Sequence, residues 1–164
     1  MNVAPDVAIC ADVTHATDTP GIDVKQHGKI TMAHVVEYED ARRMVDLGVN
    51  ILAHDVRDRE LDDAFIALLK QRNVSVIPTL AREEAMFIFG QSPAWLSDPF
   101  FLKGLRGDQP SRLASKVEEA AKLPNLAKLQ RAFAIDKINL KKLSDAGVRI
   151  ALGTDSGGDA NRFF

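Results

Sequence analysis

The stretches ITMAHV, at Ile30–Val35, and NILAHD, at Asn50–Asp55, decide the fold, because each is a short apolar run that leads into a histidine. The segment between them, EYEDARRMVDLG, carries apolar residues at helical spacing and closes with Gly48, a residue type that commonly ends helices. A strand, a helix and a second strand in this order predict two parallel strands joined by a crossover helix.

The same alternation continues along the chain. We expect Asp58 to cap the next helix, which is followed by a strand at Val74–Leu80, VSVIPTL, and by a last strand at Val148–Asp155, VRIALGTD. Between those two strands, residues 81–136 carry no strand signal and are expected to form a helical insertion. The strands are nearly all apolar, which is typical of a sheet covered on both faces. The predicted fold class is α/β, with parallel strands and crossover helices.

The composition is that of an ordinary globular protein. Hydrophobic residues make up 46% of the 164 residues and charged residues 27%, so a single sizeable core is expected. The net charge is −2 and no basic cluster is present, so neither nucleic acid nor an anionic membrane is an expected partner. The apolar runs are too short to span a bilayer and the N-terminus lacks a signal-peptide pattern, so we expect a cytoplasmic protein. Cys10 is the single cysteine, which excludes an intrachain disulfide and a cysteine metal cluster.

Three polar residues close three different predicted strands: His34, His54 and Asp155. The carboxyl ends of parallel strands meet at one rim, so these side chains are expected to point to the same place. Two imidazoles and a carboxylate suit a divalent metal such as zinc. The alternative, in which each residue has a purely structural role, stays open.

The strings HVVEYEDARRMVDLGVNILAHD, LDDAFIALLKQRNVSVIPTL and NLKKLSDAGVRIALGTDSGG resemble the later half of the amidohydrolase superfamily, especially its imidazolonepropionase-like and prolidase-like members. The resemblance covers residues 30–158 and implies a partial, half TIM-barrel-like fold. By this resemblance, His34 and His54 match the histidines of barrel strands five and six, and Asp155 matches the aspartate of strand eight. In that family the aspartate contacts the metal and accepts a proton from the attacking water. The family's His-x-His pair and its bridging lysine or glutamate have no counterpart in this sequence.

Residues 1–29 resemble a different family. Their string PDVAICADVTHATDTPGIDVKQHGK is similar to metallo-aminopeptidases of the glutamyl aminopeptidase type, in which the residue matching Asp12 is a metal ligand. The chain is therefore interpreted as a chimera, with a metallo-aminopeptidase-like piece at 1–29 and a half-barrel amidohydrolase-like domain at 30–164. In this interpretation Asp12 replaces the missing bridging residue. A turn-forming role for Asp12 stays open as the alternative.

The expected function is a metal-dependent hydrolase that acts on an amide, ester or lactone bond of a small-molecule substrate through a metal-activated water. The expected cofactor is a divalent metal, with zinc as the first candidate. The expected ligands are His34, His54, Asp155 and Asp12. Asp155 is also the expected catalytic residue, as proton acceptor. The alternative is a non-catalytic oligomeric remnant with weak or no metal binding.

The aromatic segment between Phe87 and Phe101 has two interpretations. Phe87 and Trp95 line a substrate pocket in the first, and they cover apolar surface at a subunit interface in the second. A half barrel has two open sheet edges, and unpaired edges seek partners. A homodimer or a larger homo-oligomer is therefore expected.

Overall fold

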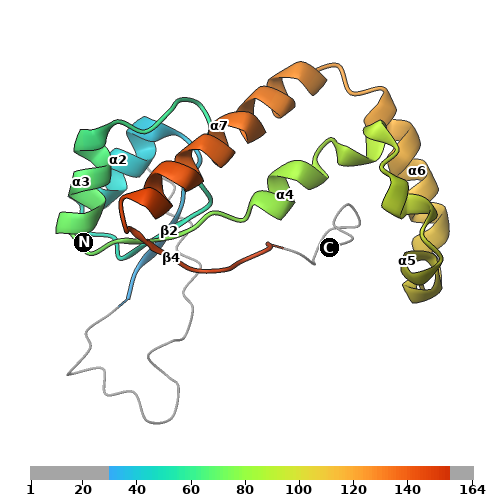
Figure 1. Cartoon of the computed structure of the whole chain (residues 1–164), viewed down its shortest axis with the longest axis horizontal. Helices are drawn as coiled ribbons and strands as arrows, with labels where there is room; N and C mark the ends of the chain where they lie inside the picture. The colour runs from blue at the N-terminus through green and yellow to red at the C-terminus, as the bar shows by residue number, and fades with distance from the viewer. Residues whose placement is uncertain (1–29, 156–164) are drawn as a thin grey trace, which may run out of the picture. The chain divides into compact units, whose positions relative to one another are not determined.

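Figure 1 shows the computed structural model, which describes residues 30–155 of the chain. The described residues form two compact units, one of residues 30–79 with 135–153 and one of residues 80–134 with 154–155. The first unit contains the sheet, and the second is built from helices.

Within the described residues the sheet has four strands, all parallel, and their order in the sheet is their order in the chain. They are β1 (Met32–His34), β2 (Ile51–Ala53), β3 (Ser75–Ile77) and β4 (Arg149–Ile150). Helices α2 (Tyr38–Asp46) and α3 (Asp63–Gln71) form the crossovers from β1 to β2 and from β2 to β3. The predicted fold class is confirmed, and this arrangement is the repeating unit of a TIM-type barrel.

The strands are shorter than the apolar runs that predict them. In Val74–Leu80 only β3 pairs as a strand, because Pro78 has no N–H to donate and Thr79 turns the backbone to a φ of 49°. Strand β4 occupies 2 residues of the predicted Val148–Asp155. The end of β3 is therefore set by local backbone chemistry and not by the extent of the apolar run.

Within the described residues of the first unit, the side chains on one face of the sheet are buried and those on the other face are half-buried or exposed. Ala33, Leu52 and Val76, at matching positions of β1, β2 and β3, are at most 4% exposed and join the core to which α2 and α3 contribute. Their neighbours along each strand project to the opposite face and are half-buried or exposed. Cover on both faces of these strands stays a prediction, because residues 1–29 and 156–164 lie outside the described part of the chain.

The helices of the first unit begin and end on local signals. Gly48 follows α2 with a φ of 91°, a conformation that glycine adopts without steric penalty. Asp62, and not Asp58, caps α3, since its carboxylate accepts a hydrogen bond from the N–H of Phe65 at 2.7 Å. Asp58 accepts instead from the N–H of Tyr38, the first residue of α2, at 2.9 Å. The loop after β2 folds back onto the preceding helix, and the sequence pattern does not show this return.

The loop between β2 and α3 is fixed by a buried side chain from helix α7 (Leu126–Asp145). Asn139 is fully buried. Its Oδ1 accepts a hydrogen bond from the N–H of Leu61 at 2.8 Å, and its Nδ2 donates to the carbonyls of Val56 and Arg59 at 2.7 and 3.0 Å. Because this loop begins at the carboxyl end of β2, Asn139 holds the chain at that point.

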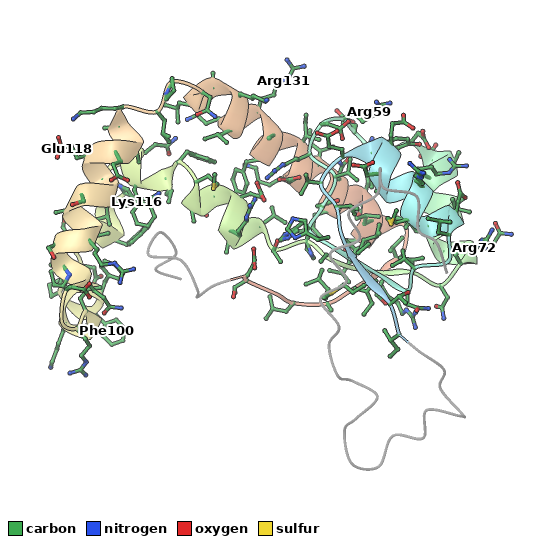
Figure 2. All side chains as sticks on the ribbon, turned by 180° about the vertical axis from the view of Figure 1, so that it is seen from behind. Arg59, Arg72, Phe100, Lys116, Glu118 and Arg131 are labelled. Atoms are coloured by element: carbon green, nitrogen blue, oxygen red, sulfur yellow. The ribbon has the colours of Figure 1, made fainter. Side chains whose placement is uncertain are left out.

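The second unit consists of short helices around a small apolar core. Its elements are α4 (Leu80–Ala85), η1 (Ile88–Gln91), η2 (Ala94–Ser97), α5 (Pro99–Gly104), α6 (Gln109–Ala121) and the first part of α7. Its buried centre contains Ala85, Phe89, Leu113 and Ala120. On α5, in contrast, the labelled side chain of Phe100 is 90% exposed (Figure 2). None of the helices in the described part of the chain is long and apolar enough to cross a membrane.

Candidate metal centre

The structure brings two of the predicted ligands, His34 and His54, into contact. His34 is the last residue of β1, opposite Ala53, and His54 directly follows β2. Nε2 of His54 lies 3.2 Å from Nδ1 of His34, and the ring centroids are 4.2 Å apart with planes inclined by 65°. The rule that the ends of neighbouring parallel strands share one rim accounts for this meeting of residues twenty positions apart.

The environment of the two imidazoles differs. His34 is exposed, whereas His54 is 5% exposed and has a φ of 73°, a left-handed conformation that is uncommon outside glycine. The N–H of His54 donates to the carbonyl of Ile77 at 2.9 Å, which ties it to β3. Its ring Nδ1 lies 2.6 Å from Oγ1 of Thr79. One ring is therefore locked in the protein and the other faces solvent.

The distance between the two ring nitrogens agrees both with a hydrogen bond and with the spacing of two nitrogens on one metal ion. Two nitrogens that bind one zinc ion at about 2.0–2.1 Å in a tetrahedral site are about 3.3 Å apart, and the observed separation is 3.2 Å. The pair supplies two ligands, whereas catalytic zinc sites commonly use three protein ligands. Among residues 30–155, no group of three or more His, Cys, Asp or Glu side chains is placed to hold a metal.

The other two predicted ligands are Asp12 and Asp155. Asp12 is outside the described residues. Asp155 belongs to the second unit, where it has a φ of 51° and its Oδ2 lies 3.7 Å from Nε of Arg82. The guanidinium of Arg82 also pairs with the buried carboxylate of Glu83. The convergence of Asp155 with the histidine pair stays a prediction.

Asp55 is a buried acid that the sequence analysis did not single out. It directly follows His54 and is 4% exposed. Its Oδ1 accepts a hydrogen bond from the N–H of Val56 at 2.8 Å, and its Oδ2 has no hydrogen-bond partner among the residues that the structure describes. Burial raises the pKa of this carboxyl to about 7, because the charged form loses its hydration. An acid at the end of an apolar strand is the signal that marks such a residue.

The two aromatic residues predicted to bind substrate pack inside the second unit. Phe87 is 4% exposed and its ring lies 5.5 Å from that of Phe133. Trp95 is half-buried, with Phe101 at 5.0 Å and Phe89 at 5.8 Å between ring centroids. Their role as substrate contacts stays a prediction.

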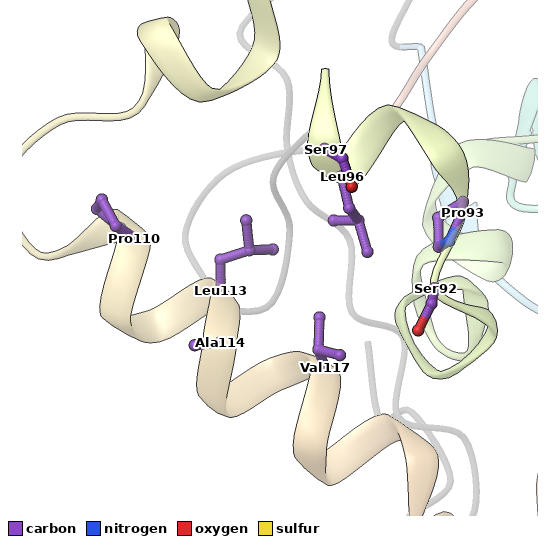
Figure 3. Close-up of a pocket in the computed structure, with 8 residues that line it drawn as sticks. All are labelled: Ser92, Pro93, Leu96, Ser97, Pro110, Leu113, Ala114 and Val117. Atoms are coloured by element: carbon purple, nitrogen blue, oxygen red, sulfur yellow. The ribbon is translucent and has the colours of Figure 1, made fainter. Parts of the chain in front are cut away.

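The second unit also contains an open pocket of about 450 Å³ between η2 and α6 (Figure 3). The residues that line it are Ser92, Pro93, Leu96, Ser97, Pro110, Leu113, Ala114 and Val117. Leu96, Leu113 and Val117 give it a mainly apolar lining. Phe87 and Trp95 are not among these lining residues.

These features define the class of protein: an α/β chain with parallel strands that carries an imidazole pair at its strand ends. No protein-family model and no curated protein matches the sequence. Solved structures that are similar to it include the two that follow. The crystal structure of A. niger ochratoxinase has a TM-score of 0.49 and 23% identity over 80% of this chain and 23% of that chain. The crystal structure of an uncharacterized protein has a TM-score of 0.52 and 21% identity over 84% of this chain and 27% of that chain.

The likeness to the uncharacterized protein bears on the fold alone. The chain spans 23% and 27% of the lengths of the two proteins. The likeness to the uncharacterized protein supports the arrangement of strands and helices, which recurs there within a longer chain. The metallo-aminopeptidase resemblance falls on residues outside the description, and neither comparison supports it.

Proposed function

We propose that this chain forms part of the metal site of a metal-dependent hydrolase, in which His34 and His54 bind one divalent ion, with zinc as the first candidate. The observation that carries the proposal is the 3.2 Å separation between Nε2 of His54 and Nδ1 of His34 at neighbouring strand ends. Without an ion these nitrogens form a hydrogen bond in which one of them carries a proton. With an ion, both nitrogens bind through their lone pairs.

The chain's own residues support the chemistry of hydrolysis. When bound, a divalent ion acidifies water and polarises a carbonyl, which cleavage of an amide, ester or lactone bond requires. The exposed ring of His34 leaves one side of the pair open to a small-molecule substrate. Asp155 is the proposed proton acceptor, and its carboxylate is 36% exposed and lies beside Arg82.

A folded, non-catalytic chain is the second candidate. The observation that favours it is that the described residues place two metal ligands together and not three. Such a site would hold zinc weakly and would not hold water in a reactive position. Zinc affinity and hydrolysis distinguish the two candidates.

The test of the proposal combines a zinc titration with a hydrolysis assay on the full chain. We expect one tightly bound zinc per site, lost in His54→Ala and kept in His27→Ala, a histidine to which no metal role is assigned. We also expect hydrolysis within a panel of amides, esters and lactones that stops with a chelator and returns with zinc. Zinc binding of equal strength in His54→Ala would overturn the proposed site. Tight zinc binding without hydrolysis would favour the second candidate.

We further propose that the chain acts as a homodimer or larger homo-oligomer. The support is the exposure of apolar residues at β4 within the described part of the chain. Leu152, just after β4, is 98% exposed, and Ile150 within it is 39% exposed. Exposed apolar side chains next to a strand edge favour association.

A further inference from the structure

Thr79 occupies an unusual position beside the histidine pair. It lies two residues beyond β3 and is 5% exposed. Its φ is 49°, in the left-handed region, where a β-branched residue is a genuine outlier. Its Oγ1 lies 2.6 Å from Nδ1 of His54, twenty-five residues earlier in the chain. A strained backbone that directs a buried hydroxyl onto a ring nitrogen calls for a functional explanation.

We propose that Thr79 is a positioning residue that accepts a hydrogen bond from Nδ1–H of His54 and thereby keeps Nε2 of that ring unprotonated and directed to the metal side. A neutral imidazole carries one ring proton, so a proton fixed on Nδ1 leaves the lone pair on Nε2. Nε2 is the nitrogen that faces Nδ1 of His34 at 3.2 Å. This inference rests on the proposed function, because it assigns the residue that prepares one of the two ligands.

Backbone and side chain act together in this arrangement. His54 and Thr79 both leave their strands with positive φ, 73° and 49°, so two adjacent strands turn in the same way at the same rim. The N–H of His54 is bonded to the carbonyl of Ile77 at 2.9 Å, which fixes the distance between the two turns. The ring of His54 is thus held at its backbone and at Nδ1, while its Nε2 faces Nδ1 of His34. Hydrogen bonds to the second nitrogen of metal-binding histidines commonly set the tautomer and orientation of the ring.

A structural role alone is the competing account. A buried hydroxyl needs a hydrogen-bond partner, and Nδ1 of His54 supplies one whether or not a metal binds. Under that account, removal of the hydroxyl lowers stability and leaves the zinc affinity of the folded protein unchanged. Zinc affinity is therefore the measurement that separates the two accounts.

The experiment compares Thr79→Val, which keeps the shape and removes the hydroxyl, with Thr79→Ser, which keeps the hydroxyl. Zinc dissociation constants are measured by competition with a chelating dye, and circular dichroism confirms folding. We expect Thr79→Val to weaken zinc binding by about 10–100-fold and Thr79→Ser to retain the wild-type affinity. Unchanged affinity in folded Thr79→Val overturns the inference while the proposed metal site stands. Absence of zinc binding in the wild type overturns the proposed function and the inference with it.

A second measurement needs no variant. Long-range proton–nitrogen NMR spectra of the wild-type protein without metal report which ring nitrogen of His54 carries the proton. We expect the Nδ1–H tautomer, with Nε2 as the unprotonated nitrogen. An Nε2–H tautomer overturns the inference even if Thr79→Val does not fold.

Discussion

Single buried polar residues hold the region around the histidine pair. Asn139 joins three backbone groups of the loop after β2, and Thr79 meets the ring of His54. The meeting of His34 and His54 could be predicted from the sequence, since the shared rim of parallel strands follows from the order of elements. The roles of Asn139 and Thr79 could not be predicted in this way. Their partners lie far away along the chain, and the spacing of residue types carries no information on such contacts.

Asn139→Ala is predicted to lower the free energy of unfolding by about 2–4 kcal/mol, because it leaves buried backbone groups of Leu61, Val56 and Arg59 without their partner. Lys141→Ala, on the same helix, is the matched control. Lys141 is exposed and pairs with Asp145 one turn away, and such pairs contribute at most about 0.5 kcal/mol. Urea unfolding of both variants measures the difference. Equal stability of the two variants would show that the loop does not depend on Asn139.

Asp62 is predicted to make the stability of the fold depend on pH in the acid range. Two hydrogen bonds to its carboxylate lower the pKa of Asp62 in the folded state. The larger effect comes from the N–H of Phe65 and the smaller from the hydroxyl of Tyr38. A lowered folded-state pKa stabilises the protein above the ordinary aspartate value of 3.8, and this contribution is lost as pH falls through the folded-state pKa.

Asp62→Ala is therefore predicted to cost about 1 kcal/mol near neutral pH. The difference from wild type should shrink as the solution becomes more acidic than pH 3.8. Asp62→Asn retains the cap and serves as the control, with a stability loss that is smaller and less dependent on acid. Chemical unfolding at a series of pH values provides the measurement. A difference between Asp62→Ala and wild type that stays constant into strong acid would contradict this assignment.

At the scale of elements, the sequence predicts the order and type of the helices and strands better than the length of the strands and the packing of helices on the sheet. Helix α2 ends before Gly48 and α7 before Gly147, because each glycine takes a positive φ that side-chain-bearing residues avoid. The strands were predicted too long, since hydrophobic residues continue past the last paired position of β3 and β4. Which face of the sheet is buried depends on where the helices pack. The sequence of a single strand does not reveal this.

Gly90 is the glycine on which the second unit depends. A Cβ at this position would lie 2.6 Å from the carbonyl oxygen of Ala120, so η1 and α6 approach closely here. Gly90→Ala is predicted to destabilise the unit by about 1–3 kcal/mol through overpacking. Gly104→Ala is the control, because a Cβ there meets nothing within 4 Å. The fluorescence of Trp95, the single tryptophan, reports unfolding of this unit. Equal thermal stability of the two variants would contradict the close approach.

At the scale of the whole molecule, the proposed association through the sheet has a direct test. Light scattering after size-exclusion chromatography is predicted to give at least twice the chain mass of 18.0 kDa. Leu152→Glu should lower the mass by placing a charge on the 98% exposed position beside β4. Leu47→Glu is the control. Leu47 is also exposed, at 69%, but it follows helix α2 and not strand β4. A wild-type monomer would contradict the proposed oligomer, and an equal effect of both variants would contradict its location.

The central claim is that the imidazoles of His34 and His54 bind one divalent ion together. X-ray absorption spectroscopy of the zinc-loaded full chain tests it most directly, because it reports the atoms bound to the metal. The account predicts two imidazole nitrogens at about 2.0–2.1 Å, both absent from the spectrum of the His34→Ala, His54→Ala double variant. A metal shell without imidazole, or a spectrum that the double variant leaves unchanged, would contradict it.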